Sequence, residues 1–172
     1  MKSPGDFGEH PRVLALIERF RCIDAAMRAL PVYNAKVAIE AIGFRPFGDD
    51  TLLGVVLTPW FMNVMTLPVE PAPIDMAEIG KTIFIELPPG KRAFVVGGDE
   101  VIGLYRAHSL HSPVLNFTLP GQACAEAQLK LAILMTPVTA ETTTSRSSSK
   151  TDIDRRALLF GRRPFSTPAP IG

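Results

Sequence analysis

The sequence is poor in the residues on which metal sites and redox centres depend. It has only 2 cysteines, Cys22 and Cys124, far apart and outside any Cys-x-x-Cys pair. This excludes the usual structural zinc, rubredoxin-like iron and thioredoxin-like sites. His108 and His111 offer no replacement, because they are predicted to point to opposite faces of a strand and its exit. We therefore expect no metal, no cofactor and two buried, reduced thiols.

The sequence patterns of common catalytic sites are missing as well. There is no Gly-x-Ser-x-Gly elbow, no glycine-rich phosphate loop and no His-Glu-x-x-His motif. Either cysteine could pair with a histidine as a nucleophile, but each lies in a helical pattern rich in Ala and Leu, which is typical of a small core residue. The sequence therefore favours a protein that is not an enzyme.

The sequence has neither a large excess of charge of one sign nor a hydrophobic run that could form an unbroken helix. The formal net charge is +1, so the chain lacks the basic field of a nucleic-acid-binding protein. The uncharged run Thr51–Val69 is long enough to test as a membrane span, but Pro59 and Pro68 would break that helix. Its flanking charges, Asp50 and Glu70, are acidic and provide no basic anchor. We expect no transmembrane segment and, at the N-terminus, no secretory signal.

The hydrophobic periodicity predicts an α+β fold with a mainly antiparallel sheet. Helical spacing covers two segments, Pro11 to about Leu30 and Pro120–Met135, and we expect both helices to pack on one face of the sheet. Strands are predicted at Lys36–Phe44, Thr51–Leu57, the extended piece after Pro59, Lys81–Leu87, Arg92–Val96 and Val101–Ala107. The last two form a hairpin, in whose loop Gly97 and Gly98 are expected to supply positive φ angles.

Composition divides the chain into four parts. Residues 1–10 are expected to be a disordered N-terminus, and residues 11–137 form one α+β domain. Residues 138–151 contain a Ser- and Thr-rich run that is typical of a flexible linker. Residues 152–172 form a basic C-terminal tail.

The stretch Thr58–Pro68 (TPWFMNVMTLP) holds the only Trp of the chain. Alternation along a strand sends Trp60, Met62 and Val64 to one face and Phe61, Asn63 and Met65 to the other. The ordinary interpretation is that all are core residues. A second interpretation is that one set lines a groove for a partner, since Met adapts to varied apolar ligands. The groove candidates are Trp60, Phe61, Met62, Asn63 and Met65.

In the tail, two Arg pairs bracket the apolar cluster Ala157–Phe160. Such a tail could simply be solvated and bind acidic surfaces without specificity. The apolar insert favours a docking segment instead, in which hydrophobic anchors enter a groove and arginines pair with carboxylates. The tail candidates are Arg155, Arg156, Leu159, Phe160, Arg162 and Arg163.

Two motifs together, TPWFMNVMTLP at 58–68 and RRALLFGRR at 155–163, resemble the HybE/HupJ family of NiFe-hydrogenase assembly chaperones. The resemblance extends through the hairpin around Gly97–Glu100 and the Ser112–Pro113 segment. It implies a cytoplasmic, non-enzymatic protein that binds hydrogenase precursors before export. The implied partners are the small subunit with its twin-arginine signal peptide, the large subunit as a further candidate, and other maturation factors. The family has no catalytic residues to carry over.

A twin-arginine signal is basic and then apolar, so its receptor should offer carboxylates beside an apolar groove. The available acids are Glu70, Asp75, Glu78, Asp99 and Glu100, of which we predict Glu70, Asp99 and Glu100 to bind the partner. The tail sequence RRALLF itself looks like such a signal, which suggests that it acts as a pseudo-ligand. The alternative function is an accessory role in iron-sulfur cluster maturation of the small subunit, together with a separate rubredoxin-like protein.

Overall fold

The structure, a computed structural model, describes residues 7–139. Its elements in chain order are α1 (Pro11–Met27), β1 (Glu40–Pro46), β2 (Thr51–Leu57), β3 (Met62–Pro68), β4 (Thr82–Leu87), β5 (Gly90–Asp99), β6 (Gly103–His111) and α2 (Gln122–Leu134). Every predicted element is present. The largest shifts are of four residues: β1 begins four residues later than predicted because residues 36–39 form a turn and an extended lead-in, and β6 ends four residues later than predicted, at His111.

The strands form one 6-stranded sheet in the order β1-β2-β3-β6-β5-β4. All neighbouring strands pair antiparallel. The predicted α+β class with a mainly antiparallel sheet is therefore confirmed. The one long crossing between strands is the connector, residues 69–81, which leads from β3 in the middle of the sheet to β4 at its edge. None of the helices within residues 7–139 is both long and apolar enough to cross a membrane.

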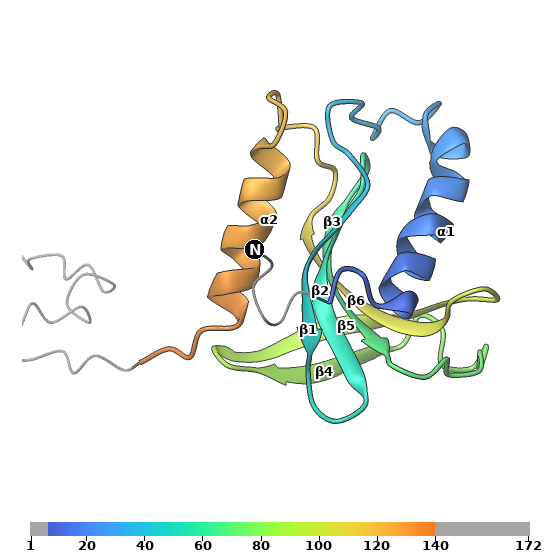
Figure 1. Ribbon diagram of the computed structural model, residues 1–172, viewed down its shortest axis with the longest axis vertical. Helices are drawn as coiled ribbons and strands as arrows, with labels where there is room; N and C mark the ends of the chain where they lie inside the picture. The colour runs from blue at the N-terminus through green and yellow to red at the C-terminus, as the bar shows by residue number, and fades with distance from the viewer. Residues whose placement is uncertain (1–6, 140–172) are drawn as a thin grey trace, which may run out of the picture. The chain divides into compact units, whose positions relative to one another are not determined.

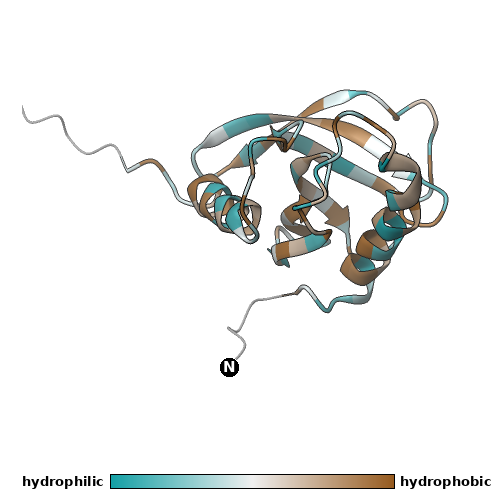
Figure 2. Ribbon diagram, turned by 90° about the horizontal axis from the view of Figure 1, so that it is seen from above, coloured by the Kyte–Doolittle hydropathy of each residue, from teal (hydrophilic) through white to brown (hydrophobic). Residues whose placement is uncertain are grey.

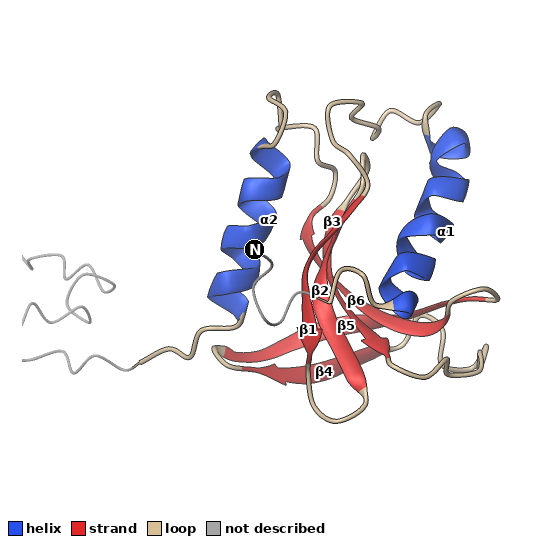
Figure 3. Cartoon of the chain, viewed as in Figure 1, coloured by secondary structure: helices blue, strands red, loops and turns tan. Residues whose placement is uncertain are grey.

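The two helices lie on opposite faces of the sheet (Figures 1 and 3), so the prediction that both pack on one face is wrong. Strand β2 shows why. Leu53 and Val55 pack in the cluster under α2, whereas Leu52 and Val56 pack in the cluster under α1. A strand that is covered on both faces does not alternate between apolar and polar residues. The uninterrupted apolar run of β2 is the sequence pattern that corresponds to this burial.

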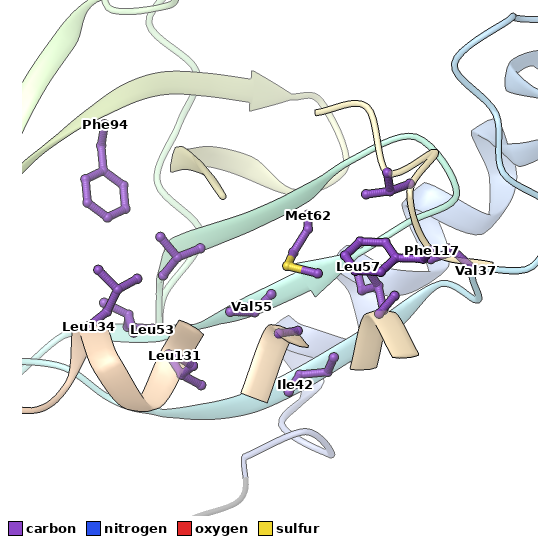
Figure 4. Packing of buried hydrophobic residues seen from close by; sticks show 14 of the residues in the cluster. Val37, Ile42, Leu53, Val55, Leu57, Met62, Phe94, Phe117, Leu131 and Leu134 are labelled. Carbon is purple, nitrogen blue, oxygen red and sulfur yellow. The ribbon is translucent and has the colours of Figure 1, made fainter. Parts of the chain in front are cut away.

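Each helix covers its own hydrophobic cluster. Figure 2 shows hydrophobic residues along the strands that lie between the helices, while hydrophilic residues recur along both helices. Figure 4 shows the cluster on the α2 side, where Leu131 and Leu134 of α2 lie against Leu53 and Val55 of β2. The sheet therefore lies between two hydrophobic cores instead of covering a single one.

Helix α1 begins and is stabilised as its sequence predicts. Pro11 occupies the first turn, and the His10 side chain accepts a hydrogen bond from the Arg12 N–H at 3.2 Å. On the surface of α1, Arg28 pairs with Asp24 at 2.7 Å, and Arg21 pairs with Glu18 at 3.6 Å. Both pairs lie three or four residues apart on the helix surface, where opposite charges attract weakly.

The hairpin of β5 and β6 corrects one prediction. Gly97 and Gly98 are strand residues without positive φ, and it is Gly103, after the turn, that has a φ of 78°. Gly97 is needed for a different reason: a Cβ atom there would lie 2.5 Å from the ring of Tyr105 on the paired strand. The glycine pair thus permits close packing across the ladder instead of forming the loop.

Candidate partner-binding site

Residues Thr58–Phe61 form the tight turn between β2 and β3. The Thr58 hydroxyl oxygen accepts hydrogen bonds from the Trp60 N–H at 3.3 Å and from the Phe61 N–H at 3.0 Å. The Thr58 N–H donates to the Phe61 carbonyl at 2.9 Å. Trp60 therefore precedes the strand, and the alternation predicted for it begins only at Met62.

Trp60 is a core residue under α1 in this structure. Its side chain is only 8% exposed and stacks on Tyr33 with ring centroids 6.3 Å apart. It also contacts Phe20 and Phe61 edge-on, at 6.4 and 5.9 Å. Aromatic edge-to-face contacts add to the free energy of burial. The turn thus anchors α1 to the sheet.

The other groove candidates divide between surface and core. Met62 is 0% exposed in the α2 cluster and Met65 is 1% exposed in the α1 cluster, so the predicted opposite facing of these two residues is confirmed. Phe61 and Asn63 are half-buried. Only these two of the five groove candidates offer surface to a partner in this conformation.

The acidic candidates lie at the end of the sheet where β3 finishes. No Lys, Arg or His occurs between Arg45 and Lys81, whereas Asp49, Asp50, Glu70, Asp75 and Glu78 all do. The Val69 N–H donates to the Asp50 carbonyl at 2.9 Å, so the turn between β1 and β2 lies beside the start of the connector. Acidic residues from two chain segments are thereby brought to one end of the sheet.

Arg12 joins this end to the turn between β5 and β6. Its Nε donates to the Pro68 carbonyl at 3.1 Å and its Nη2 to the Ile102 carbonyl at 2.6 Å. Arg12 is 8% exposed. Burial lowers the pKa of Arg12, and the negative charge of Glu70 acts in the opposite direction. Arg12 thus holds the connector and the turn side by side.

The connector lies directly on the turn after β5. The Leu104 N–H donates to the Ala72 carbonyl at 3.1 Å, and a Cβ atom at position 103 would lie 2.4 Å from that carbonyl oxygen. Only glycine allows this approach. The contact forms an open hollow of about 380 Å³, which we call the connector hollow, lined by Pro71, Ala72, Pro73, Ile74, Glu100, Val101 and Gly103.

A second, more enclosed hollow shares Ala72 with the first. Its volume is about 110 Å³, and it is lined by Pro68, Ala72, Glu78, Ile83, Val96, Leu104, Tyr105 and Arg106. Burial, followed by the charge of Asp99, raises the pKa of Tyr105, so its hydroxyl stays neutral. A mostly apolar lining that includes the charged Glu78 and Arg106 suits an apolar side chain of a partner.

The three acids predicted to bind a partner have different surroundings. Asp99 pairs with Arg19 at 2.8 Å and accepts from the Val101 N–H at 2.9 Å. Burial alone would raise the pKa of Asp99, but hydrogen bonds from Val101, Arg19 and the Ile102 backbone, together with the charge of Arg19, outweigh burial and lower the pKa. Glu70 and Glu100 are exposed and form no salt bridge within the described part of the chain. They are the carboxylates available to a basic ligand.

The cysteines differ from expectation. Both are free thiols, but Cys22 is exposed on α1 and Cys124 is half-buried, so the prediction that both are buried is wrong. The reason for Cys22 is that the buried side of α1 runs through Leu16, Ile17 and Phe20. Burial, then neighbouring Glu40, raises the pKa of Cys124, which disfavours a nucleophilic thiolate. Within residues 7–139, no group of three or more His, Cys, Asp or Glu could hold a metal ion.

Some of this site was not predicted. The tail candidates Arg155, Arg156, Leu159, Phe160, Arg162 and Arg163 lie outside the described residues. Arg12, Val101 and Gly103 were missed. Gly103 carries a usable signal, a glycine directly before a β-rich run. Arg12 carries none, because its carbonyl partners lie 56 and 90 residues away.

Comparison with known proteins identifies the family. Residues 11–161 match the family model described as "[NiFe]-hydrogenase assembly, chaperone, HybE". The chain belongs to the HybE family. The chain is 40% identical to the hydrogenase expression/formation protein HupJ of Bradyrhizobium diazoefficiens over 139 residues, which cover 80% of each chain. It is 34% identical to the hydrogenase expression/formation protein HoxT of Azotobacter vinelandii over 148 residues, covering 84% of this chain and 94% of that one.

Two further comparisons concern architecture. The HybE fold is seen in the solution structure of HybE from Escherichia coli, which matches with a TM-score of 0.54 and 19% identity over 88% of this chain and 91% of that chain. The protein named probable rubredoxin HupJ of Rhodobacter capsulatus is 35% identical over 113 residues. This match covers 65% of the present chain but only 40% of that protein. As a HybE family member, the chain is a hydrogenase assembly chaperone, and hydrogenase subunits are its implied partners.

Proposed function

We propose that the protein is a non-enzymatic cytoplasmic chaperone that binds the precursor of the NiFe-hydrogenase small subunit through its twin-arginine signal peptide before export. The large subunit is a second candidate client. The observation that supports this is that exposed Glu100 lines the connector hollow, and exposed Glu70 directly precedes Pro71, another of its lining residues. A ligand that is basic and then apolar meets carboxylates and a hydrophobic surface in the same place.

The connector hollow is pre-organised, because contacts within the protein hold its walls in place without a ligand. Arg12 fixes the end of β3 against the turn after β5, and Arg19 pairs with Asp99, the last residue of β5 before that turn. The connector is rich in proline, which limits the backbone freedom that binding would otherwise remove. Pre-organisation of this kind favours affinity for an extended segment without a large folding cost.

Titration calorimetry with the small subunit's signal peptide tests the proposal. We expect saturable binding that weakens about tenfold in the double variant Glu70→Gln/Glu100→Gln, because two charge-assisted contacts are lost. The matched control is Glu18→Gln/Glu40→Gln, which removes the same charge from exposed positions away from the hollow and should leave affinity within about twofold. A twin-lysine peptide should bind more weakly, because lysine cannot pair with a carboxylate in the bidentate way of arginine.

Two results would contradict the proposal. The first is equal affinity of the two double variants for the twin-arginine peptide. The second is no binding by the folded wild-type protein, which would redirect attention to the mature part of a hydrogenase subunit. Binding should also weaken as salt is raised, because the paired charges are exposed.

A second candidate function is cooperation with a rubredoxin-like protein during small-subunit maturation. The observation that favours it is the Rhodobacter capsulatus relative, a protein named as a probable rubredoxin that this chain matches over 40% of its length. Sedimentation of this protein mixed with an iron-loaded rubredoxin tests the idea. Co-sedimentation at a fixed ratio supports it, and independent sedimentation at micromolar concentrations contradicts it.

A further inference from the structure

The two edges of the sheet are treated differently. Strand β1, at one edge, is irregular: its register shifts between Ile42 and Arg45, and it ends in Pro46. The Phe7 N–H donates to the outer carbonyl of Phe44 at 2.8 Å, so part of this edge is already paired. Bulges, prolines and covering segments are the devices by which proteins prevent further strands from adding to an edge.

Strand β4, at the other edge, has almost none of these devices. Its pairing with β5 is regular from Thr82 to Leu87, and the strand contains neither lysine nor proline. Outside that pairing, no backbone hydrogen bond from the rest of residues 7–139 reaches Thr82, Phe84 or Glu86. The outer side of β4 is therefore an exposed edge.

The hydrogen-bond pattern shows which backbone groups are presented there. The Val96 N–H donates to the Lys81 carbonyl at 2.8 Å, so the Lys81 carbonyl points toward β5. Since the residues whose backbone groups face the paired strand alternate along an antiparallel ladder, Ile83 and Ile85 also point their backbone groups toward β5. The N–H and C=O groups of Thr82, Phe84 and Glu86 therefore point outward.

An apolar surface lies beside this edge. Phe84 is 72% exposed, and Val95, which pairs with Thr82 on β5, is 48% exposed. Exposed Ala93 is paired directly with Phe84. The three side chains share the face of the sheet opposite α2, because Ile83 and Phe94 between them pack on the α2 side. A strand added to β4 would bury Phe84 against apolar neighbours.

Charge differs between the two ends of this edge. Acidic Asp75 and Glu78 come just before β4, although Lys81 pairs with Glu78 at 2.6 Å. Lys91 and Arg92 follow the turn at the other end, where Lys91 lies 4.0 Å from Glu86. An extended segment with a basic N-terminal end is thus attracted to the start of β4 and repelled from its end.

We propose that β4 is a strand-addition site for an extended client segment that is basic at its N-terminal end and apolar thereafter, bound parallel to β4. The site names the docking mode of the proposed function and rests on it. Main-chain hydrogen bonds to Thr82, Phe84 and Glu86 would supply affinity with little dependence on sequence, while Phe84 and Val95 favour apolar side chains. Asp75 and Glu78 set the direction.

Backbone N-methylation of the signal peptide tests the mode directly with the wild-type protein. A methyl group on residues whose N–H faces β4 removes a hydrogen bond and blocks approach, whereas one on the intervening residues does neither. We expect one alternate set of N-methylated peptides to lose about tenfold in affinity by calorimetry and the other set less than about twofold. Equal losses in both sets would overturn the proposal.

A pair of protein variants tests the same edge from the other side. Thr82→Pro removes an outward N–H without removing a bond to β5, and Thr82→Val is the matched control that retains it. We expect Thr82→Pro to weaken binding about tenfold and Thr82→Val less than about twofold, with both variants folded by circular dichroism. If Thr82→Pro does not fold, the N-methylated peptides decide alone.

The outcomes separate this inference from the proposed function. Binding that is unaffected by N-methylation and by Thr82→Pro, but weakened by Glu70→Gln/Glu100→Gln, overturns strand addition and leaves the chaperone proposal standing. No binding of the unmodified peptide overturns both. A spin label on the basic end of the peptide is expected to broaden amide signals of residues 75–80 more than those of Gly90 to Arg92, and the reverse result would overturn the parallel orientation.

Discussion

Helix α1 is attached to the sheet by charged and aromatic side chains in addition to the aliphatic Val13, Leu16 and Ile17, whereas the buried residues of α2 are only small or aliphatic. Arg12 donates to the carbonyls of Pro68 and Ile102, and Arg19 pairs with Asp99. The buried residues of α2 are Ala123, Ala127, Leu131 and Leu134. Directional bonds to charged groups fix position, while apolar contacts mainly fill volume.

This difference bears on function because of what α1 is bonded to. Its arginines reach the connector and the turn after β5, which carry Glu70 and Glu100. The residues of α2 instead contact β1 and β2, on the face of the sheet opposite α1. We therefore expect changes on the α1 side to alter both stability and partner binding, and changes on the α2 side to alter stability alone.

The largest effect is expected at the aromatic anchor of α1. Trp60→Ala should lower the free energy of unfolding by about 3–5 kcal/mol, because the cavity it leaves lies among Phe20, Tyr33 and Phe61. Urea unfolding followed by circular dichroism measures it, with Leu131→Ala as the counterpart under α2. A loss below about 1 kcal/mol for Trp60→Ala would show that Trp60 is not a core residue.

Replacing the buried Arg12 is the sharpest test of the proposed difference between α1 and α2 in partner binding. Arg12→Met leaves two carbonyls without their donors and should lower the free energy of unfolding by about 2–3 kcal/mol. It should also weaken signal-peptide binding, because the connector hollow loses its tie. Leu134→Ala on α2 is the control: it should cost comparable stability and leave affinity unchanged below its unfolding transition. Equal effects on affinity would refute the distinction.

A pair of glycines measures how tightly α2 sits on the sheet. Gly43 and Gly48 have similar φ angles of 61° and 71°, but a Cβ atom at Gly43 would lie 2.5 Å from Leu131 Cδ2, and none lies within 4 Å at Gly48. Both alanine variants should lose about 1–2 kcal/mol from backbone strain. We expect Gly43→Ala to lose roughly a further 1 kcal/mol in urea unfolding from the displaced leucine. Equal losses in Gly43→Ala and Gly48→Ala would mean that Leu131 of α2 moves aside without a measurable cost in stability.

The smallest effect concerns the Arg19–Asp99 pair. The pKa of Asp99 is lowered in the folded protein, so its contribution to stability is present above the unfolded-state pKa and is lost as pH falls through the folded-state pKa. Asp99→Asn should therefore cost about 0.5–1 kcal/mol near neutral pH and nothing in strong acid. Urea unfolding across this pH range tests it. A pH-independent cost would assign the effect to the lost backbone contact with Val101 alone.

Local patterns were enough to predict most of the elements. Proline at a helix start, regular apolar spacing and prolines after a helix located α1 and α2 to within a few residues. Strand β2 was predicted with its observed bounds, because a short apolar run between turn residues has few other conformations. Two motifs also indicated the family, because each is one short contiguous stretch of sequence.

The same patterns could not show on which side of the sheet each element lies. An apolar run such as Leu52–Leu57 is compatible with burial on one face or two, and only the chain path places the helices on opposite faces. Trp60 was expected to lie on the same face as Met62, but the hydrogen bonds of Thr58 turn the backbone before the strand begins, and Trp60 packs in the other cluster. The alternation of side chains between two faces holds only along a continuous strand, so it cannot be extended across a turn.

The grouping of Glu70 with Glu100, and the exposed edge of β4, were decided by tertiary structure alone. Both depend on contacts between segments far apart in sequence, such as that of Arg12 with Ile102 across 90 residues. Hydrophobic spacing and turn residues report the local conformation of a segment, which is set by its own sterics and by the side it buries. Which distant segment supplies the other half of a surface depends on how the whole chain packs.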